Sequence, residues 1–245
     1  MMKDEREAGL LEQARVEEKS YNWVEAAKLY EQATKSFLDK KMGEEAARAC
    51  KKLGYACARA AGTAETAEEY VGLNKRAAEA YKEAANLFKQ TGNRPEELEC
   101  EAEAFCASGF VAGSVMEGKK ALSRSYELFI ESSELYSEKN VQESFARTLS
   151  RAAWASAALV SYCYDRWELE QLTQKVRDVA DKAWNLANEI GNVQYLAESF
   201  FGESSIVLAE MGTVPFRWDE RWKEYGRKFL LRCDESLKLA EGCDD

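Results

Sequence analysis

The sequence contains no histidine, and this absence removes much of the usual catalytic repertoire. Neither a Ser-His-Asp nor a Cys-His nucleophile can be assembled without an imidazole base. Zinc sites with histidine ligands and the Glu-x-x-His di-iron site are excluded for the same reason. We therefore expect no enzyme, no catalytic residue, no bound metal and no cofactor.

Proline and glycine are also scarce, since the 245 residues include only 2 Pro and 14 Gly. A β-sandwich or a barrel needs many turns, and these two residues are common turn formers. Apolar residues make up 46% of the chain and aromatic residues 11%, which is enough to form a core and argues against disorder. The composition therefore favours an all-α fold.

The charge is unbalanced toward the acidic side. The chain has 44 Asp and Glu residues against 34 Lys and Arg residues, so the formal net charge is −10. Such a chain is repelled by phosphate backbones and anionic lipid, which argues against nucleic acid or a membrane surface as a partner. No run of 18 apolar residues occurs, so we expect no membrane insertion. A protein or peptide partner fits better, and the overall charge suits a basic one.

The cysteines are odd in number, and no two of them show the C-x-x-C spacing of a zinc or redox site. They are Cys50, Cys57, Cys100, Cys106, Cys163, Cys233 and Cys243. Most lie in alanine- and leucine-rich stretches, where a cysteine acts as a small apolar core residue in a reducing compartment. The N-terminal sequence also lacks the apolar segment of a secretion signal. We therefore expect a cytoplasmic protein.

Helix start and stop signals divide the chain at regular intervals. Glycine or asparagine stands where amphipathic runs end, a position at which a left-handed backbone is common. These residues are Gly43, Gly62, Gly92, Gly113, Asn140, Gly191 and Gly212. The segments Thr66-x-x-Glu69, Ser114-x-x-Glu117 and Asp165-x-x-Glu168 have the spacing of capping boxes, which begin helices.

Together these signals predict about ten helices. Their ranges are 3–19, 22–39, 44–61, 66–91, 95–112, 117–138, 141–163, 168–190, 193–211 and 219–241. The connections between them are short, so successive helices are expected to be antiparallel neighbours.

One motif recurs along the chain: a small residue, an aromatic residue four positions later, and another small residue three positions after the ring. Small residues let two helices approach closely while the ring fills the groove between them. The matches are Ala26-Tyr30-Ala33, Ala77-Tyr81-Ala84, Ser125-Phe129-Ser132 and Ala180-Trp184-Ala187, with a looser one at Cys233-Leu237-Ala240. The first four central residues are 51, 48 and 55 positions apart. This spacing, one match per helix pair, indicates a repeat protein.

The segment Asn22-Trp23-x-x-Ala26-x-x-x-Tyr30-x-x-Ala33 resembles the second helix of a tetratricopeptide (TPR) repeat. Lys52-Leu53-Gly54-Tyr55 is similar to part of a TPR first helix, although the spacing to its tyrosine differs. A TPR unit has about 34 residues, fewer than the units of this chain. Residues 76–88 resemble the repeats of the soluble NSF attachment proteins (SNAPs), which are TPR-like solenoids with long helices.

The resemblance implies a right-handed TPR-like α-solenoid of about five antiparallel helix pairs, forming a single repeat domain over residues 1–245. The expected units are 3–41, 44–91, 95–139, 141–190 and 193–241. In TPR proteins the first helices line a concave face that binds an extended peptide or a partner helix, so the same is expected here.

Two rows of basic and aromatic residues at helical spacing are candidates for this groove. They are Arg48, Lys52, Tyr55 and Arg59 in the third predicted helix, and Arg147, Arg151 and Trp154 in the seventh. Guanidinium and ammonium groups beside rings can bind carboxylates. The alternative for the first row is a solvated helix flank. The alternative for the second is a core tryptophan with arginines paired to acids such as Glu143.

Two further surfaces have open interpretations. The stripe Trp218, Trp222, Tyr225 and Phe229, preceded by Phe216, either packs inward or forms a homodimer or docking interface. Acidic residues cover more than one side of the fifth predicted helix, at Glu97, Glu99, Glu101 and Glu103. We interpret this acidic helix as a solvated surface that keeps the protein soluble, with contact to a basic partner as the alternative.

These features predict a non-enzymatic scaffold or adaptor that presents a helical groove to a peptide, a helix or a partner domain. One alternative is a reader of phosphopeptides or acidic motifs, similar in role to the 14-3-3 proteins. Another is a metal enzyme without histidine, built on paired carboxylates such as Glu198 and Glu203.

Overall fold

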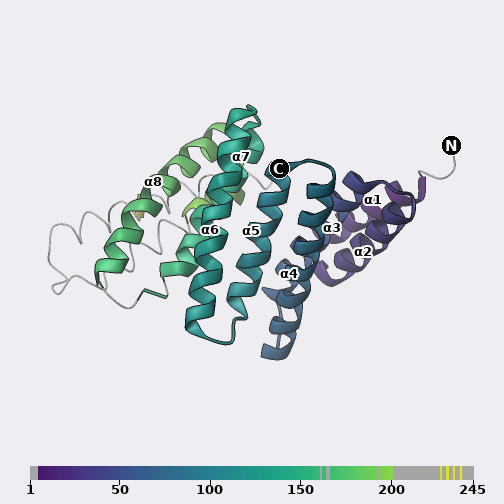
Figure 1. Cartoon of the computed structure of the whole chain (residues 1–245), viewed down its shortest axis with the longest axis horizontal. Helices are drawn as coiled ribbons and strands as arrows, with labels where there is room; N and C mark the ends of the chain where they lie inside the picture. The colour runs from purple at the N-terminus through teal and green to yellow at the C-terminus, as the bar shows by residue number, and fades with distance from the viewer. Residues whose placement is uncertain are drawn as a thin grey trace. The chain divides into compact units, whose positions relative to one another are not determined.

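Every regular element in the described part of the chain is an α-helix (Figure 1). The structure, a computed structural model, describes residues 5–160, 162–163, 166–192 and 194–200, and residues 227, 230, 231, 234 and 238. The helices are α1 (Glu5–Lys19), α2 (Trp23–Asp39), α3 (Gly43–Ala61), α4 (Ala67–Gln90), α5 (Arg94–Phe110), α6 (Val115–Glu138), α7 (Gln142–Val160) and α8 (Arg166–Ile190). Residues 194–200 are also helical. The predicted all-α fold is confirmed, with helix ends within three residues of those expected for α1 to α8.

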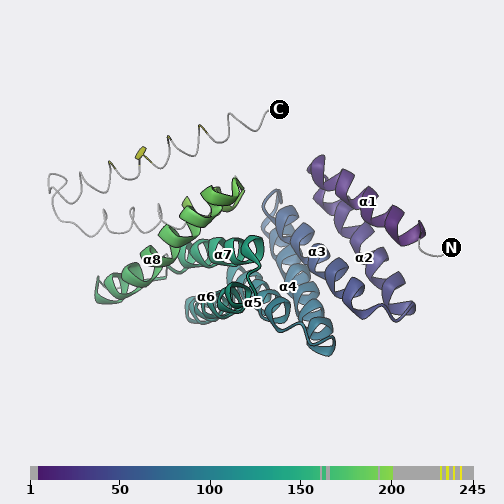
Figure 2. The same cartoon turned by 90° about the horizontal axis from the view of Figure 1, so that it is seen from above.

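The chain forms two compact units, residues 1–128 and 129–245, and the boundary lies within α6. In the first unit each of the helices α1 to α4 packs on the next one in sequence. Figure 2 shows α1 beside α2 and α3 beside α4. In the second unit α7 packs on α8. Because the connections are only a few residues long, successive helices run antiparallel. None of the helices described has the length and apolar character required to span a membrane.

Ion pairs also connect helices that are two positions apart in sequence. In the first unit these pairs are Lys52–Glu18 at 3.5 Å (α3 to α1), Lys51–Glu99 at 2.8 Å (α3 to α5) and Arg76–Glu31 at 2.7 Å (α4 to α2). In the second unit the Ser150 and Ser199 hydroxyls lie 3.1 Å apart and join α7 to the helix at 194–200. Odd-numbered and even-numbered helices of the first unit therefore lie in separate layers, as expected for stacked hairpins.

The same turn ends α1, α2, α4, α6 and α8. One residue takes a left-handed backbone, and the next N–H bonds to the carbonyl five residues back, which is the Schellman arrangement. The left-handed residues are Tyr21, Lys41, Gly92, Asn140 and Gly191, with φ between 57° and 74°. Asn93 shows the long bond, since its N–H donates to the Phe88 carbonyl at 2.9 Å. From Lys41 onward these residues are 51, 48 and 51 positions apart, so the turn repeats nearly in step with the ring motif.

Several predicted helix ends need correction. Gly43 does not end α2 but is the first residue of α3. Neither Gly62 nor Gly113 has a left-handed backbone. Tyr21 and Lys41 take that conformation instead, although a side chain there costs on the order of 1 kcal/mol. The sequence rule favours glycine and asparagine, so it missed both. Gly212 and Asp165 lie outside the described residues.

The hydroxyl half of each predicted capping box, at Thr66 and at Ser114, is confirmed. Each hydroxyl accepts the backbone N–H three residues later, at 3.1 Å for Glu69 and 3.3 Å for Glu117. The Glu69 carboxylate accepts the N–H of Glu65 at 3.1 Å, so it caps the residue before the threonine. Local side-chain bonds therefore fix where α4 and α6 begin.

The ring motif fills the core, as predicted. Its aromatic residues Tyr30, Tyr81, Phe129 and Trp184 are each exposed by 5% or less, and the flanking small residues by at most 1%. Gly54 of α3 leaves room for the Tyr81 ring, because a Cβ at this glycine would lie 2.8 Å from the ring Cγ. The looser match at residues 233–240 lies outside the described residues.

Four cysteines also belong to the core, which agrees with their predicted role. Cys50, Cys57, Cys100 and Cys106 are buried, and Cys163 is half-buried. Burial raises the pKa of the Cys50 thiol to about 12 and that of Cys57 to about 11. These two thiols therefore stay protonated near neutral pH and act as apolar residues. Cys233 and Cys243 lie outside the described residues.

Glu7 fastens α1 to α2. Its nearly covered carboxylate accepts hydrogen bonds from the Lys40 ammonium and the Ser36 hydroxyl. These bonds, that of Lys40 first, lower the pKa of Glu7 from 4.5 to about 2. Because the folded pKa lies below the unfolded one, the stabilisation is complete above pH 4.5 and is lost as the pH falls toward 2.

Replacing Glu7 by glutamine should therefore lower the unfolding free energy at pH 7. The difference between wild type and Glu7→Gln should shrink as the pH falls from 4.5 toward 2, because the wild-type carboxylate becomes protonated. Urea titrations at pH 7, 4 and 3 would measure this difference. Glu12→Gln is the matched control, since Glu12 is exposed and, among the residues that the structure describes, pairs only with Arg15 at 3.5 Å. A constant difference across this range would contradict the assignment.

Candidate functional site

Three of the four candidate residues on α3 join a tryptophan from α2 in one chain of contacts. The Lys52 ammonium lies 5.4 Å from the centre of the Tyr55 ring, and that ring meets Trp23 edge-on at 5.8 Å. The Arg59 guanidinium lies over the Trp23 ring at 5.3 Å. Lys52, Tyr55 and Arg59 thus form a cation–aromatic surface over the buried Trp23 ring, and we call these four residues the α3 ledge.

Trp23 was missed as a site residue, although the sequence carried a signal for it. In an antiparallel pair, residues at equal distances from the connecting turn lie opposite each other. Trp23 and Arg59 are each 18 positions from Lys41, the left-handed residue of the α2–α3 turn. Helix boundaries alone therefore place the indole and the guanidinium at the same level of the two helices.

Arg48 does not join the ledge. Its guanidinium donates to the Glu44 carboxylate one turn earlier, at 2.6 Å, and its side chain is exposed. An exposed pair four residues apart is worth only about 0.3–0.5 kcal/mol. Arg48 therefore sits on a solvated flank of α3.

The charges of the ledge are only partly balanced from within the protein. Lys52 lies 3.5 Å from the Glu18 carboxylate, at the long end for an ion pair. Arg59 has no carboxylate partner among the described residues. Arg59 is exposed and contacts Trp23 through a cation–π interaction, so the N–H groups of its guanidinium stay able to donate. The edge of a guanidinium can bind a carboxylate through two parallel hydrogen bonds.

The row on α7 has a different environment. Arg151 lies near the rings of Phe129 and Trp154, at 5.9 and 4.6 Å, and pairs with Glu198 at 3.8 Å. Arg147 lies 6.0 Å from the Tyr136 ring. These contacts bring the row together with rings and an acid of its own unit, although the acid is Glu198 and not Glu143. They agree with the alternative interpretation in part, since Arg151 pairs with an acid, but Trp154 is half-buried and not a core residue.

The two rows occupy equivalent positions of the repeat. The turn residues Lys41 and Asn140 are 99 positions apart, and the same step relates the rows. The equivalent pairs are Arg48 and Arg147, Lys52 and Arg151, and Tyr55 and Trp154. They differ in how far they are covered, since the Lys52 side chain is 52% exposed and that of Arg151 only 20%. The α3 ledge is therefore the open copy, and we take it as the candidate site.

The acidic residues of α5 are not a solvated surface, which corrects the sequence interpretation. Glu97, Glu99 and Glu103 are buried, and Glu101 is half-buried. Lys51 of α3 binds the Glu99 carboxylate at 2.8 Å and also contacts Glu96. The interpretation failed because it treated α5 as isolated, whereas α3 and α4 both cover it.

The remaining sequence candidates yield no further site. Trp218, Trp222, Tyr225 and Phe229 lie outside the described residues, as do Phe216 and Glu203. Over the part of the chain that the structure describes, no three or more cysteine or acidic side chains converge as metal ligands.

No protein-family model matches the chain, and a search of curated proteins found no match either. Among solved structures, the chain is similar to a de novo designed helical repeat protein. The identity is 15%, the match covers 98% of this chain and 95% of the designed one, and the TM-score is 0.31. A likeness at this level carries no argument about function.

Proposed function

We propose that this protein is a non-enzymatic, TPR-like interaction scaffold that binds an acidic segment of a protein partner on the α3 ledge. Arg59 carries this proposal, because it is held against Trp23 with its donors open and has no carboxylate partner in the described part of the chain. At the equivalent α7 row, Glu198 and the neighbouring rings already occupy Arg151.

Acidic side chains suit the ledge better than a phosphate does. A phosphate carries nearly two charges and is typically bound by a cluster of arginines. The ledge offers one guanidinium, and its ammonium is shared with Glu18. A carboxylate needs only one planar fork of donors, which Arg59 supplies.

Replacing Arg59 or Lys52 by glutamine should weaken the binding of an acidic peptide. We expect about a tenfold loss for Arg59→Gln, equal to about 1.4 kcal/mol, and a smaller loss for Lys52→Gln. Arg48→Gln is the matched control, since it removes the same charge from the same helix but outside the ledge. Fluorescence anisotropy with a labelled Glu- and Asp-rich dodecapeptide would measure these affinities, and thermal melts would check the fold.

Two further peptides make this test decisive. The proposal requires that the Gln and Asn counterpart binds more weakly than the acidic peptide. Equal binding of the two peptides, or unchanged affinity in Arg59→Gln, would refute it. A phosphoserine peptide that binds much more tightly than the acidic one would favour the phosphopeptide reader instead.

A further inference from the structure

An exposed tyrosine occupies a strained position beside the ledge. Tyr21 lies in the α1–α2 turn with φ of 59° and is 74% exposed. The equivalent turns use lysine, asparagine or glycine, and this backbone region favours glycine. The ring meets Trp23 edge-on at 6.1 Å, a contact that adds little burial for so exposed a side chain. The fold alone therefore gives little reason for a tyrosine here.

Two further exposed apolar residues, both valines, flank this tyrosine in sequence. Val16 lies in the last turn of α1 and Val24 in the first turn of α2, and both are about half exposed. Single exposed apolar residues are common, but these three lie within nine positions of one another across one tight turn. We call Val16, Tyr21 and Val24 the turn patch.

The rim of the turn patch has a positive excess. Glu25 pairs with Lys28 at 2.8 Å, whereas Glu17 accepts a hydrogen bond from the neutral Asn22 amide at 2.8 Å and keeps its charge. Lys19 and Arg59 have no carboxylate partner among the residues described. The patch thus combines apolar surface with uncompensated cations, which complements an acidic segment that carries an apolar side chain.

We propose that the turn patch anchors an apolar side chain of the same acidic partner that binds the α3 ledge. This inference rests on the proposed function and names the second feature of the partner: a leucine-like or aromatic residue next to its carboxylates. The rings of Tyr21 and Trp23 connect the patch directly to Arg59. The local cations Lys19 and Arg59, rather than the net charge of the chain, favour a short acidic segment here, and a second copy of this chain is the competing occupant that sedimentation tests.

Replacing Tyr21 by glycine tests this proposal, since glycine suits the left-handed backbone and removes only the ring. The probe is the labelled Glu- and Asp-rich dodecapeptide with a central leucine, beside a version with serine at that place. Tyr21→Gly should bind the leucine peptide about tenfold more weakly and the serine peptide as well as wild type does. Its melting temperature should be no lower than that of wild type. Val16→Ser should likewise weaken the binding of the leucine peptide.

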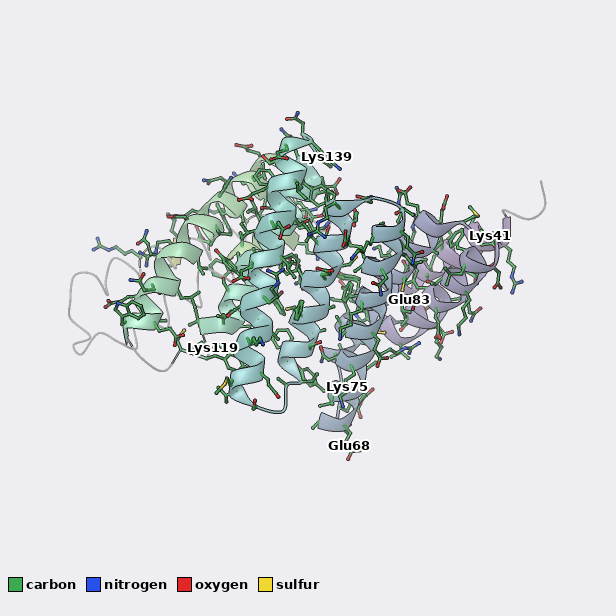
Figure 3. All side chains as sticks on the ribbon, viewed as in Figure 1. Lys41, Glu68, Lys75, Glu83, Lys119 and Lys139 are labelled. Carbon is green, nitrogen blue, oxygen red and sulfur yellow. The ribbon has the colours of Figure 1, made fainter. Side chains whose placement is uncertain are left out.

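Lys41→Gly is the matched control, because Lys41 holds the same left-handed position in the next turn, between α2 and α3 (Figure 3). It should leave both affinities unchanged. Suppose that Tyr21→Gly binds the leucine peptide with wild-type affinity while Arg59→Gln binds it more weakly than wild type. The proposal for the turn patch would then be wrong, and the proposal for the α3 ledge would stand. Binding of neither peptide by wild type would overturn both proposals. A dimer in sedimentation that Tyr21→Gly dissociates, with peptide affinity intact, would assign the patch to a second copy instead.

Discussion

Replacing Gly54 by alanine is expected to destabilise the protein, although this change usually stabilises a helix. Glycine in a helix interior costs about 0.5–1 kcal/mol relative to alanine. At Gly54, however, the new Cβ would lie 2.8 to 2.9 Å from three atoms of the Tyr81 ring. These atoms are at the base of a rigid, buried ring, so relief requires α3 and α4 to move apart. We expect a net loss of about 2 kcal/mol in unfolding free energy, measured by urea denaturation.

Gly72→Ala provides the matched control for this prediction. Gly72 lies inside α4, and a Cβ there would meet no heavy atom within 4 Å. Only the helix propensity should change, so we expect a gain of about 0.5–1 kcal/mol. If Gly54→Ala and Gly72→Ala shift the unfolding free energy in the same direction, then close packing of the Tyr81 ring does not require glycine at position 54.

The helices could be predicted from the sequence because their signals are local. Thr66 caps α4 through the N–H of Glu69, three residues away, and the 3.6-residue period reports the buried face. The turn at Lys41 could not be predicted in this way. Its left-handed backbone belongs to a local Schellman turn, closed by the Met42 N–H that donates to the Phe37 carbonyl at 2.9 Å, but lysine is not a residue that the sequence rule associates with this conformation.

The candidate site could be predicted only in part, because burial depends on neighbouring helices. The spacing of Lys52 and Arg151 placed each on one face of its helix, but the helix at 194–200 covers Arg151 while Lys52 stays open. Glu99 is buried because Lys51, 48 positions earlier, accompanies it. A charge pattern read along one helix carries no information about such partners, which explains why the acidic face of α5 was taken for a solvated one.

Replacing Lys51 by methionine should cause the largest loss of stability among these variants. The Lys51 ammonium contacts Glu96 at 2.6 Å and Glu99 at 2.8 Å, and Glu99 is only 2% exposed. Removing one partner of a buried ion pair costs about 3–5 kcal/mol, since the other charge stays buried without it. Because Lys51 and Glu96 retain some contact with water, we expect about 3 kcal/mol, at the low end of that range. Urea denaturation at pH 7 would measure the loss.

The neighbouring Lys52→Met is the matched control and should change the unfolding free energy by less than about 1 kcal/mol, because Lys52 is half exposed and only 3.5 Å from Glu18. The double variant Lys51→Met with Glu99→Met then separates two causes of the loss. If the cost comes from a buried carboxylate deprived of its ammonium, the double variant should be more stable than Lys51→Met alone, since an apolar pair can replace a buried ion pair at little cost. A double variant that is less stable still would mean that Glu99 stabilises α5 through contacts other than Lys51, and that the ion pair does not hold α3 to α5.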